Sequence, residues 1–294
     1  MIRSLLFLPC NNPNMLINAA FLGADAIILD LEDAVSPDEK DAARILARNT
    51  LRYMDLKGKE KIVRINSIDT EFCKADIAAV LPEKPDMLLV PKTNFAADVL
   101  AVDEYLTELE KKLGIPAYST GIMALIETAV GVENAYSISS CSPRVKALLL
   151  GAEDLTADLR CERTKGGKEI EYSRSRVVVA ARAAGLEVYD TPFTDVNDDQ
   201  GIIADCLIAK GFGFTGKASI SPRHIEVINE TFSPSESEID YAYQVIDAIS
   251  VAKENGKGAV ALRGKMIDAP IVARAERVIA MAKILGKGKK EDDE

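Results

Sequence analysis

Leu148-Leu149-Leu150-Gly151-Ala152-Glu153-Asp154-Leu155 is the stretch that decides the fold of this chain. Three leucines form an apolar run short enough for one buried strand, a glycine ends the run, and two adjacent carboxylates follow. Strands of a parallel sheet read as continuous apolar runs because helices cover both faces of the sheet. A carboxylate just past such a strand points into the mouth of the fold, where α/β proteins bind their ligands.

The same order of residues occurs earlier in the chain, in Gly121-Ile122-Met123-Ala124-Leu125-Ile126-Glu127-Thr128. An apolar run again ends in a carboxylate. Two carboxylates at two strand ends can hold one hard cation, because Mg²⁺ takes oxygen ligands and often only one or two of them come from protein.

Composition narrows the classes of function. The chain has 294 residues, of which 48% are hydrophobic and 28% charged, so it can bury a large core. Its net charge of −10 argues against nucleic acid and anionic membranes as partners. A small anionic substrate would therefore need a local group of cations or a metal. No apolar run approaches the roughly 20 residues of a membrane span, and the first residues lead into a strand without a signal peptide.

Cysteine and histidine usage excludes several kinds of site. The five cysteines are scattered without a CxxC pair, which matches no zinc pattern and indicates reduced thiols in the cytoplasm. His224 is the only histidine, so a His-rich zinc site and a Ser-His-Asp triad are nearly excluded. We expect His224 to pack or cap near Pro222.

Eight apolar strands alternate with helices, and this pattern predicts an α/β fold, a closed (β/α)₈ TIM barrel. The predicted strands are Ser4–Leu8, Ala26–Asp30, Lys61–Asn66, Met87–Pro91, Gly121–Ile126, Ala147–Gly151, Leu186–Asp190 and Phe212–Ser219. The predicted helices between them include Pro13–Phe21, a helix from Ser36 to about Leu56, Phe95–Leu113, Glu169–Ala184 and Asn197–Lys210.

Beyond the barrel, the sequence predicts extra C-terminal helices at Ser235–Asn255 and Asp268–Leu285. We therefore expect three parts: a barrel over residues 1–232, a helical extension over 233–285, and a charged, disordered tail over 286–294.

Charged residues stand where the predicted strands stop. They are Asp30, Arg64, Lys92, Glu127, Asp154, Asp190 and Lys217. Barrel enzymes gather their active sites at this face. A buried arginine needs an anionic partner, which for Arg64 is either Glu127 or Asp154, or a substrate carboxylate held by the guanidinium fork. Asp30 and Lys217 are candidates for an internal ion pair.

The chain resembles the citrate lyase β-subunit family, within the wider group of acyl-thioester lyases and metal-dependent aldolases. The motifs that carry the resemblance occur in the same order along the chain as in the family. The matching segments are Arg3–Pro9, Leu29–Val35, Val63–Asn66, Val90–Lys92, Ala124–Thr128, Gly151–Leu155 and Gly264–Pro270. Leu159–Thr164 with Gly167–Glu169 is more similar to the citrate lyase subunit than to stand-alone CoA-thioester relatives. Cys10 stands where the family usually has glycine, and Ser219–Pro222 differs from the His-Pro or Asn-Pro of relatives.

The resemblance implies cleavage of citryl carried on an acyl carrier protein, giving oxaloacetate and the acetyl carrier. It implies that Glu127 and Asp154 bind Mg²⁺ and that Arg64 binds the oxaloacetate portion. It also implies partners: a citrate lyase α subunit and the acyl carrier protein (γ) subunit, in a homotrimer or a hetero-oligomer.

Further roles follow for individual residues. Besides Arg64 and Glu127, the resemblance makes Asp268 a catalytic acid/base candidate that reaches the active site of a neighbouring subunit. Its position also suits the N-cap of the helix that begins near Pro270. Lys92 is expected to contact substrate as electrostatic support. Glu32 and Asp33 either reach water molecules on the metal or simply begin a loop.

Alternatives stay open at this point. Glu153 either touches the site or forms a salt bridge. A basic group consists of Arg160, Arg163, Lys165 and Lys168. It either contacts a phosphopantetheine arm or an acidic carrier protein, or it belongs to a solvated loop. The chain as a whole could instead be a stand-alone malyl-, citramalyl- or citryl-CoA lyase, or a non-catalytic subunit that presents the thioester.

Overall fold

A computed structural model of the chain describes residues 1–254 and 258–288. The chain divides into two compact units, one spanning residues 2–229 and the other containing the residues from 230 onward together with Met1. The larger unit carries the predicted barrel. No helix within the described ranges is long and apolar enough to cross a membrane.

Parallel strands close into a barrel in sequence order, with the last strand pairing with the first. The barrel strands of the described chain are β1 (Ser4–Pro9), β2 (Ala26–Asp30), β3 (Glu60–Arg64), β4 (Met87–Val90), β5 (Gly121–Ile126), β6 (Val145–Leu150), β7 (Glu187–Asp190) and β8 (Gly216–Ser219). The predicted (β/α)₈ barrel is confirmed.

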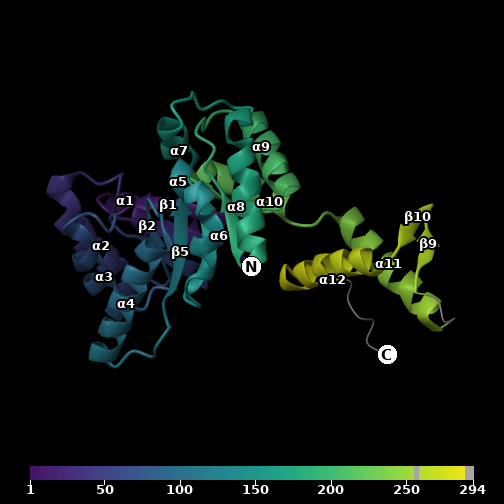
Figure 1. Cartoon of the computed structure of the whole chain (residues 1–294), viewed down its shortest axis with the longest axis horizontal. Helices are drawn as coiled ribbons and strands as arrows, with labels where there is room; N and C mark the ends of the chain where they lie inside the picture. Colours follow the sequence, from purple (N-terminus) through teal and green to yellow (C-terminus); the bar gives the residue numbers. More distant parts are fainter. Residues whose placement is uncertain (255–257, 289–294) are drawn as a thin grey trace. The chain divides into compact units, whose positions relative to one another are not determined.

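Helices alternate with these strands and cover the outside of the barrel (Figure 1). They are α1 (Pro13–Ile17), α2 (Lys40–Tyr53), α3 (Phe72–Val80), α4 (Ala96–Leu113), α5 (Ala129–Glu133), α6 (Ala135–Ser140), α7 (Ala152–Asp158), α8 (Glu171–Ala183), α9 (Asp199–Phe212) and α10 (Ile225–Phe232). β2, β4 and β5 are buried along their whole length, which is why their sequences are nearly continuous apolar runs.

Side chains alternate between the two faces of the barrel wall, and this alternation positions the site. Leu125, Leu149, Tyr189 and their counterparts on the other strands fill the barrel interior. Near the C-terminal end of a strand, the residue two positions after an inward-facing residue also faces inward and reaches the mouth of the barrel. The residue one position after an inward-facing residue points outward to the helices.

Several predicted boundaries differ from the structure. The helix predicted over Pro13–Phe21 ends at Ile17 and continues as a separate 3₁₀ turn, and the helix expected to reach Leu56 ends at Tyr53. The eighth strand is shorter than predicted because α9 extends through Phe212. The short helices α3, α5, α6 and α7 were not predicted, since each is too short to show a clear helical period.

The smaller unit contains the predicted C-terminal helices, here α11 (Glu236–Glu254) and α12 (Ala269–Ile284). Between them lies an antiparallel hairpin that the sequence did not predict, formed by β9 (Val260–Leu262) and β10 (Lys265–Ile267). The apolar core of the smaller unit includes Val245, Ile267 and Ala275. Most of the tail predicted over residues 286–294 lies outside the described residues.

Candidate active site

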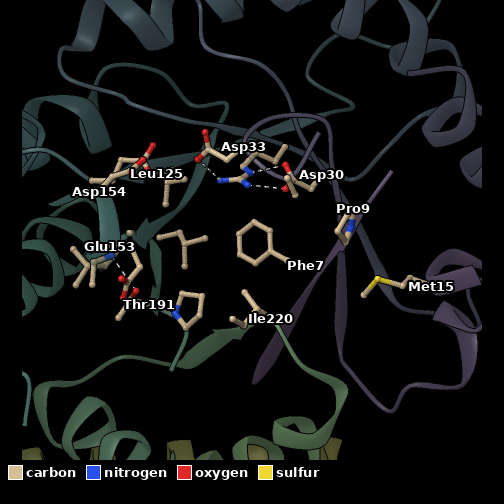
Figure 2. A pocket seen from close by; sticks show the side chains of 18 residues that line it. Phe7, Pro9, Met15, Asp30, Asp33, Leu125, Glu153, Asp154, Thr191 and Ile220 are labelled. Carbon is tan, nitrogen blue, oxygen red and sulfur yellow. Dashed lines mark hydrogen bonds and ion pairs between the residues drawn. The ribbon is translucent and has the colours of Figure 1, made fainter. Parts of the chain in front are cut away.

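A cavity of about 450 Å³ opens at the C-terminal ends of the barrel strands. Figure 2 shows the side chains around it. They are Phe7, Pro9, Met15, Asp30, Asp33, Ala34, Arg64, Leu125, Glu127, Leu149, Leu150, Gly151, Ala152, Glu153, Asp154, Thr191, Pro192 and Ile220. Both apolar and acidic side chains line the cavity. The expected gathering of charged strand ends is therefore present for Asp30, Arg64, Glu127 and Asp154.

Glu127 follows β5 and is 4% exposed. Its carboxylate oxygen Oε1 accepts a hydrogen bond of 2.6 Å from the backbone N–H of Lys92. A Cβ at Gly151 would stand 2.8 Å from both Cβ and Oε2 of Glu127. Glycine therefore allows the end of β6 to approach the Glu127 carboxylate closely, and this explains the glycine in the stretch that decides the fold.

Asp154 lies in the first turn of α7, the short helix that follows Gly151. Its carboxylate lines the cavity and makes no hydrogen bond or ion pair within residues 1–254 and 258–288. It is close enough to raise the pKa of Glu127 by charge repulsion. The two carboxylates expected to share a cation thus face one cavity from neighbouring strand ends.

Arg64 is held by an aspartate on the next strand. Nε and Nη2 donate to the two carboxylate oxygens of Asp30 at 2.7 and 2.6 Å. Asp30 and Arg64 occupy paired positions of β2 and β3, so both side chains leave the same face of the wall. The guanidinium carbon lies 5.0 Å from the centre of the Phe7 ring. The prediction that Glu127 or Asp154 pairs with Arg64 is wrong, because the strand register places Asp30 beside it.

Glu32 and Asp33 complete a network around the remaining edge of Arg64. Nη1 of Arg64 lies 3.0 Å from Glu32 Oε2 and 3.6 Å from Asp33 Oδ2. Lys92 Nζ donates to Glu32 Oε1 at 2.6 Å. In Figure 2 dashed lines join the guanidinium to both Asp30 and Asp33. Each cation of the network is therefore shared by more than one carboxylate.

Lys92 contributes through its backbone and its side chain. Its φ of 50° is in the left-handed region, which is uncommon for a residue with a side chain. This turn directs the N–H to Glu127 while the side chain reaches Glu32 and, at 3.4 Å, Asp33. Desolvation would lower the pKa of Lys92, but the hydrogen bond to Glu32 and the nearby carboxylates raise it above its ordinary value, so the amine stays protonated.

The electrostatics of Glu127 fit a bound cation. Burial raises the pKa of Glu127 to about 8, the Lys92 N–H lowers it, and the charges of Glu32 and Asp154 raise it. An ionised Glu127 is therefore costly without a countercharge. Glu32 Oε2 also accepts no hydrogen bond within the described residues, although Arg64 lies near it. A hard divalent cation would relieve these costs, and the donors are the oxygens that Mg²⁺ prefers.

Asp190 and Lys217 do not reach the cavity. They follow the inward-facing Tyr189 and precede the inward-facing Ala218, so both point outward to the helices. Lys217 Nζ lies 2.6 Å from Asp190 and 2.6 Å from Asp205 of α9. The predicted ion pair between Lys217 and Asp30 is wrong, because the two side chains lie on opposite sides of the barrel wall.

Arg174 of α8 joins this outer network. Its guanidinium donates to Asp190 at 2.8 Å and to Asp205 at 2.6 Å. All four side chains are at most 1% exposed. They clamp two helices to the barrel wall and take no part in the cavity.

Two of the four members of the basic group after α7, Arg163 and Lys165, form ion pairs. Arg163 bonds Glu169 at 2.7 Å, and Lys165 lies 2.7 Å from both Asp195 and Asp198. Glu153 lies 3.7 Å from Arg163 and also lines the cavity, so both alternatives for this residue are present. His224 is buried in the 3₁₀ turn η5 (Pro222–His224) and packs near Phe193, with ring centres 6.1 Å apart.

Asp268 lies in the smaller unit and caps α12. Its carboxylate accepts a hydrogen bond of 3.4 Å from the backbone N–H of Ile271. The helix-capping alternative is thus present in the structure. A catalytic contribution from the same side chain remains a prediction.

Sequence reasoning missed Phe7, Thr191 and Ile220 as residues that line the cavity. Phe7 lies two positions after the inward-facing Leu5, so counting by twos along β1 would have identified it. Thr191 directly follows β7, and its hydroxyl accepts a hydrogen bond of 3.0 Å from Ala152 N–H. No signal in the sequence marks that contact, because it joins two separate loops.

Comparison with known proteins identifies the family of the chain. A sequence profile described as HpcH/HpaI aldolase/citrate lyase matches residues 3–222. The chain belongs to this family. Citrate lyase subunit beta from Leuconostoc mesenteroides is 42% identical over 95% of this chain and 93% of the relative. The family makes the chain a carbon–carbon lyase.

Two further relatives indicate the range of chemistry in the family. A (3S)-malyl-CoA thioesterase from Cereibacter sphaeroides is 35% identical over 96% of this chain and 95% of the relative. A crystal structure of the protein CitE from Mycobacterium tuberculosis, in complex with magnesium, acetoacetate and coenzyme A, is 30% identical. It has a TM-score of 0.78 and covers 96% of this chain and 98% of its own.

Proposed function

We propose that this chain is a Mg²⁺-dependent citryl-thioester lyase that acts on citryl carried by an acyl carrier protein. Its products are oxaloacetate and the acetyl carrier. The observation that carries the proposal is the convergence of Glu127, Asp154 and Arg64 on one cavity. Two carboxylates suited to a hard cation lie beside a cation suited to a substrate carboxylate, as cleavage of a hydroxy acid with several carboxylates requires.

Glu127 and Asp154 are the residues that would hold Mg²⁺. When bound, the ion would supply Lewis-acid polarisation of the substrate hydroxyl and carboxylate oxygens. Glu32 and Asp33 lie close enough to Arg64 and Lys92 to fix the position of both cations.

The chemistry breaks the bond between the hydroxyl-bearing carbon and the carbon next to the thioester. The hydroxyl loses its proton as its carbon becomes the keto carbon of oxaloacetate. The electron pair of the broken bond stays with the thioester fragment as an enolate, which then takes a proton. Arg64 orients the oxaloacetate carboxylate, and the charge of Lys92 supports it. Asp268 is the proposed proton carrier.

The assembly we propose contains a citrate lyase α subunit and an acyl carrier protein (γ) subunit, with this chain as a homotrimer or within the hetero-oligomer. We place it in the cytoplasm, since all five cysteines are free thiols. The −10 net charge is unfavourable for binding nucleic acid or an anionic membrane, so neither is a proposed partner.

The test is a substrate panel with the purified chain. Citryl-acyl carrier protein, citryl-CoA and malyl-CoA are each supplied with Mg²⁺ or with EDTA, and both oxaloacetate and free thiol are measured. We expect oxaloacetate from the carrier-bound substrate, only with Mg²⁺. Glu127→Gln and Asp154→Asn should abolish it, whereas Asp41→Asn, on the outer helix α2, should not.

A second candidate is a stand-alone CoA lyase or thioesterase, which the malyl-CoA thioesterase relative and the coenzyme A complex favour. Oxaloacetate from citryl-CoA at the carrier-bound rate would indicate the former, and free thiol without a keto acid would indicate the latter. A non-catalytic presenting subunit would bind neither Mg²⁺ nor oxaloacetate in calorimetry.

A further inference from the structure

The position of Asp154 depends on a very short helix. α7 has seven residues, too few to be stable by its own hydrogen bonds, and Gly151 at its N-cap offers no side chain. The first N–H of the helix, that of Ala152, instead donates to the hydroxyl of Thr191 after β7. α7 is therefore held in place by contacts with its neighbours.

The other end of α7 is tied to the segment that carries Glu127. Asp158 is the last residue of α7, four positions and about one turn after Asp154. Its Oδ2 accepts a hydrogen bond of 2.7 Å from the backbone N–H of Ala129. Ala129 begins α5 and is two residues beyond Glu127. Figure 1 shows α5 and α7 next to each other past the end of β5.

This contact satisfies a backbone donor that α5 itself leaves open. The hydroxyl of Thr128, the N-cap residue, accepts from Gly131 N–H at 3.0 Å. The N–H of Ala129 has no partner inside the helix, because the first N–H groups of any helix lack one. The carboxylate of Asp158 supplies it, and a negative charge at a helix N-terminus is favourable.

We propose that Asp158 is a positioning residue for the cation site: it fixes the spacing between Glu127 and Asp154. The inference rests on the proposed function. Asp158 connects the chain segment after Glu127 to the helix that presents Asp154, so the two carboxylates move together. Without this connection, α7 keeps its attachment at Thr191 and the packing of the buried Leu155 and Thr156, but its C-terminal end is no longer tied to the segment after Glu127, and the distance between Asp154 and Glu127 is less tightly fixed.

The test measures Mg²⁺ binding by titration calorimetry with MgCl₂ alone, without substrate. Asp158→Ala should weaken Mg²⁺ binding about tenfold, in the range typical for residues that orient metal ligands. Asp158→Asn keeps an oxygen acceptor for Ala129 N–H and should bind nearly as the unchanged chain does. Asp158→Glu keeps the charge but is one methylene longer, so it should bind several-fold more weakly.

The matched control is Asp198→Ala. Asp198 also caps a helix from the protein surface, accepting from Gly201 N–H at 2.9 Å, but its helix α9 carries neither Glu127 nor Asp154. Its loss should lower the melting temperature without changing Mg²⁺ affinity. Circular dichroism confirms that each variant is folded.

The outcomes separate this inference from the proposed function. If Asp154→Asn abolishes Mg²⁺ binding while Asp158→Ala binds as the unchanged chain does, the positioning role is overturned and the cation site stands. If Asp158→Asn binds as weakly as Asp158→Ala, charge and not position matters, and the inference fails. If Asp154→Asn binds as the unchanged chain does, the cation site itself is wrong.

Discussion

Replacing Glu127 with glutamine should stabilise the metal-free protein at neutral and alkaline pH. Glutamine has nearly the same shape, and its carbonyl can still accept the backbone N–H of Lys92. The substitution removes only the ability to ionise. Because burial raises the pKa of Glu127 from its ordinary 4.5 to about 8, ionisation of this carboxyl is a cost that the folded state bears and the unfolded chain does not.

The sign and size of the effect follow from proton linkage. Between pH 4.5 and 8 the folded state holds a proton on Glu127 that the unfolded chain has lost, so stability falls as pH rises through this window. One pKa unit corresponds to about 1.4 kcal/mol, so the cost approaches about 5 kcal/mol at full ionisation. From pH 6 to pH 8 the loss of stability is about 2 kcal/mol.

Urea denaturation in EDTA at pH 6, 7 and 8 measures this loss. The unchanged chain should lose about 2 kcal/mol over the range relative to Glu127→Gln, whose profile subtracts the titration of every other group. Saturating Mg²⁺ should cancel the difference, because a cation binds the ionised carboxylate. Parallel pH profiles for the two proteins in EDTA would refute the reasoning, since Glu127 would then ionise at no cost to the fold.

Three further substitutions test the site and its support. Gly151→Ala places a methyl group against Glu127 and should lower kcat/KM and cost about 1–3 kcal/mol in urea denaturation; Gly166→Ala, with open space around it, should change neither. Lys217→Met leaves two buried aspartates without this cation and should cost about 3–5 kcal/mol; a loss below 1 kcal/mol in urea would contradict the clamp. Asp268→Asn keeps a capping oxygen, so melting and Mg²⁺ calorimetry should be unchanged while steady-state turnover is mostly lost; undiminished turnover would remove its catalytic role.

The barrel was predictable because most of the strands are apolar runs that stop at or beside a charged residue. Strand ends alone could not separate Glu127, which enters the cavity, from Asp190, which faces the helices. The difference is one of parity along each strand, and parity needs strand boundaries accurate to a single residue. The partner of Arg64 was missed for a related reason: it depends on the register between β2 and β3, which local sequence does not specify.

Long-range loop contacts were beyond the sequence for a different reason. The hydrogen bonds from Ala152 to Thr191 and from Ala129 to Asp158 each join residues 29 or more positions apart. In the sequence, Thr191 and Asp158 are ordinary polar residues that could equally have been solvated side chains. Only the closed barrel brings these loops together, so their meaning appears only after the fold is known.

The two hydrogen bonds from Arg64 to Asp30 have a consequence for which acids the cavity selects. An arginine on a free stem gives up rotamer freedom when it captures an anion, whereas this guanidinium is already immobile before any guest arrives. Asp30 holds one edge of the guanidinium and Glu32 and Asp33 face Nη1, so a guest carboxylate must take the place of Glu32 or Asp33 at Nη1. An acid of the right length does so at little entropic cost to the arginine, whereas one that is a carbon too short or too long meets an arginine that does not move to follow it.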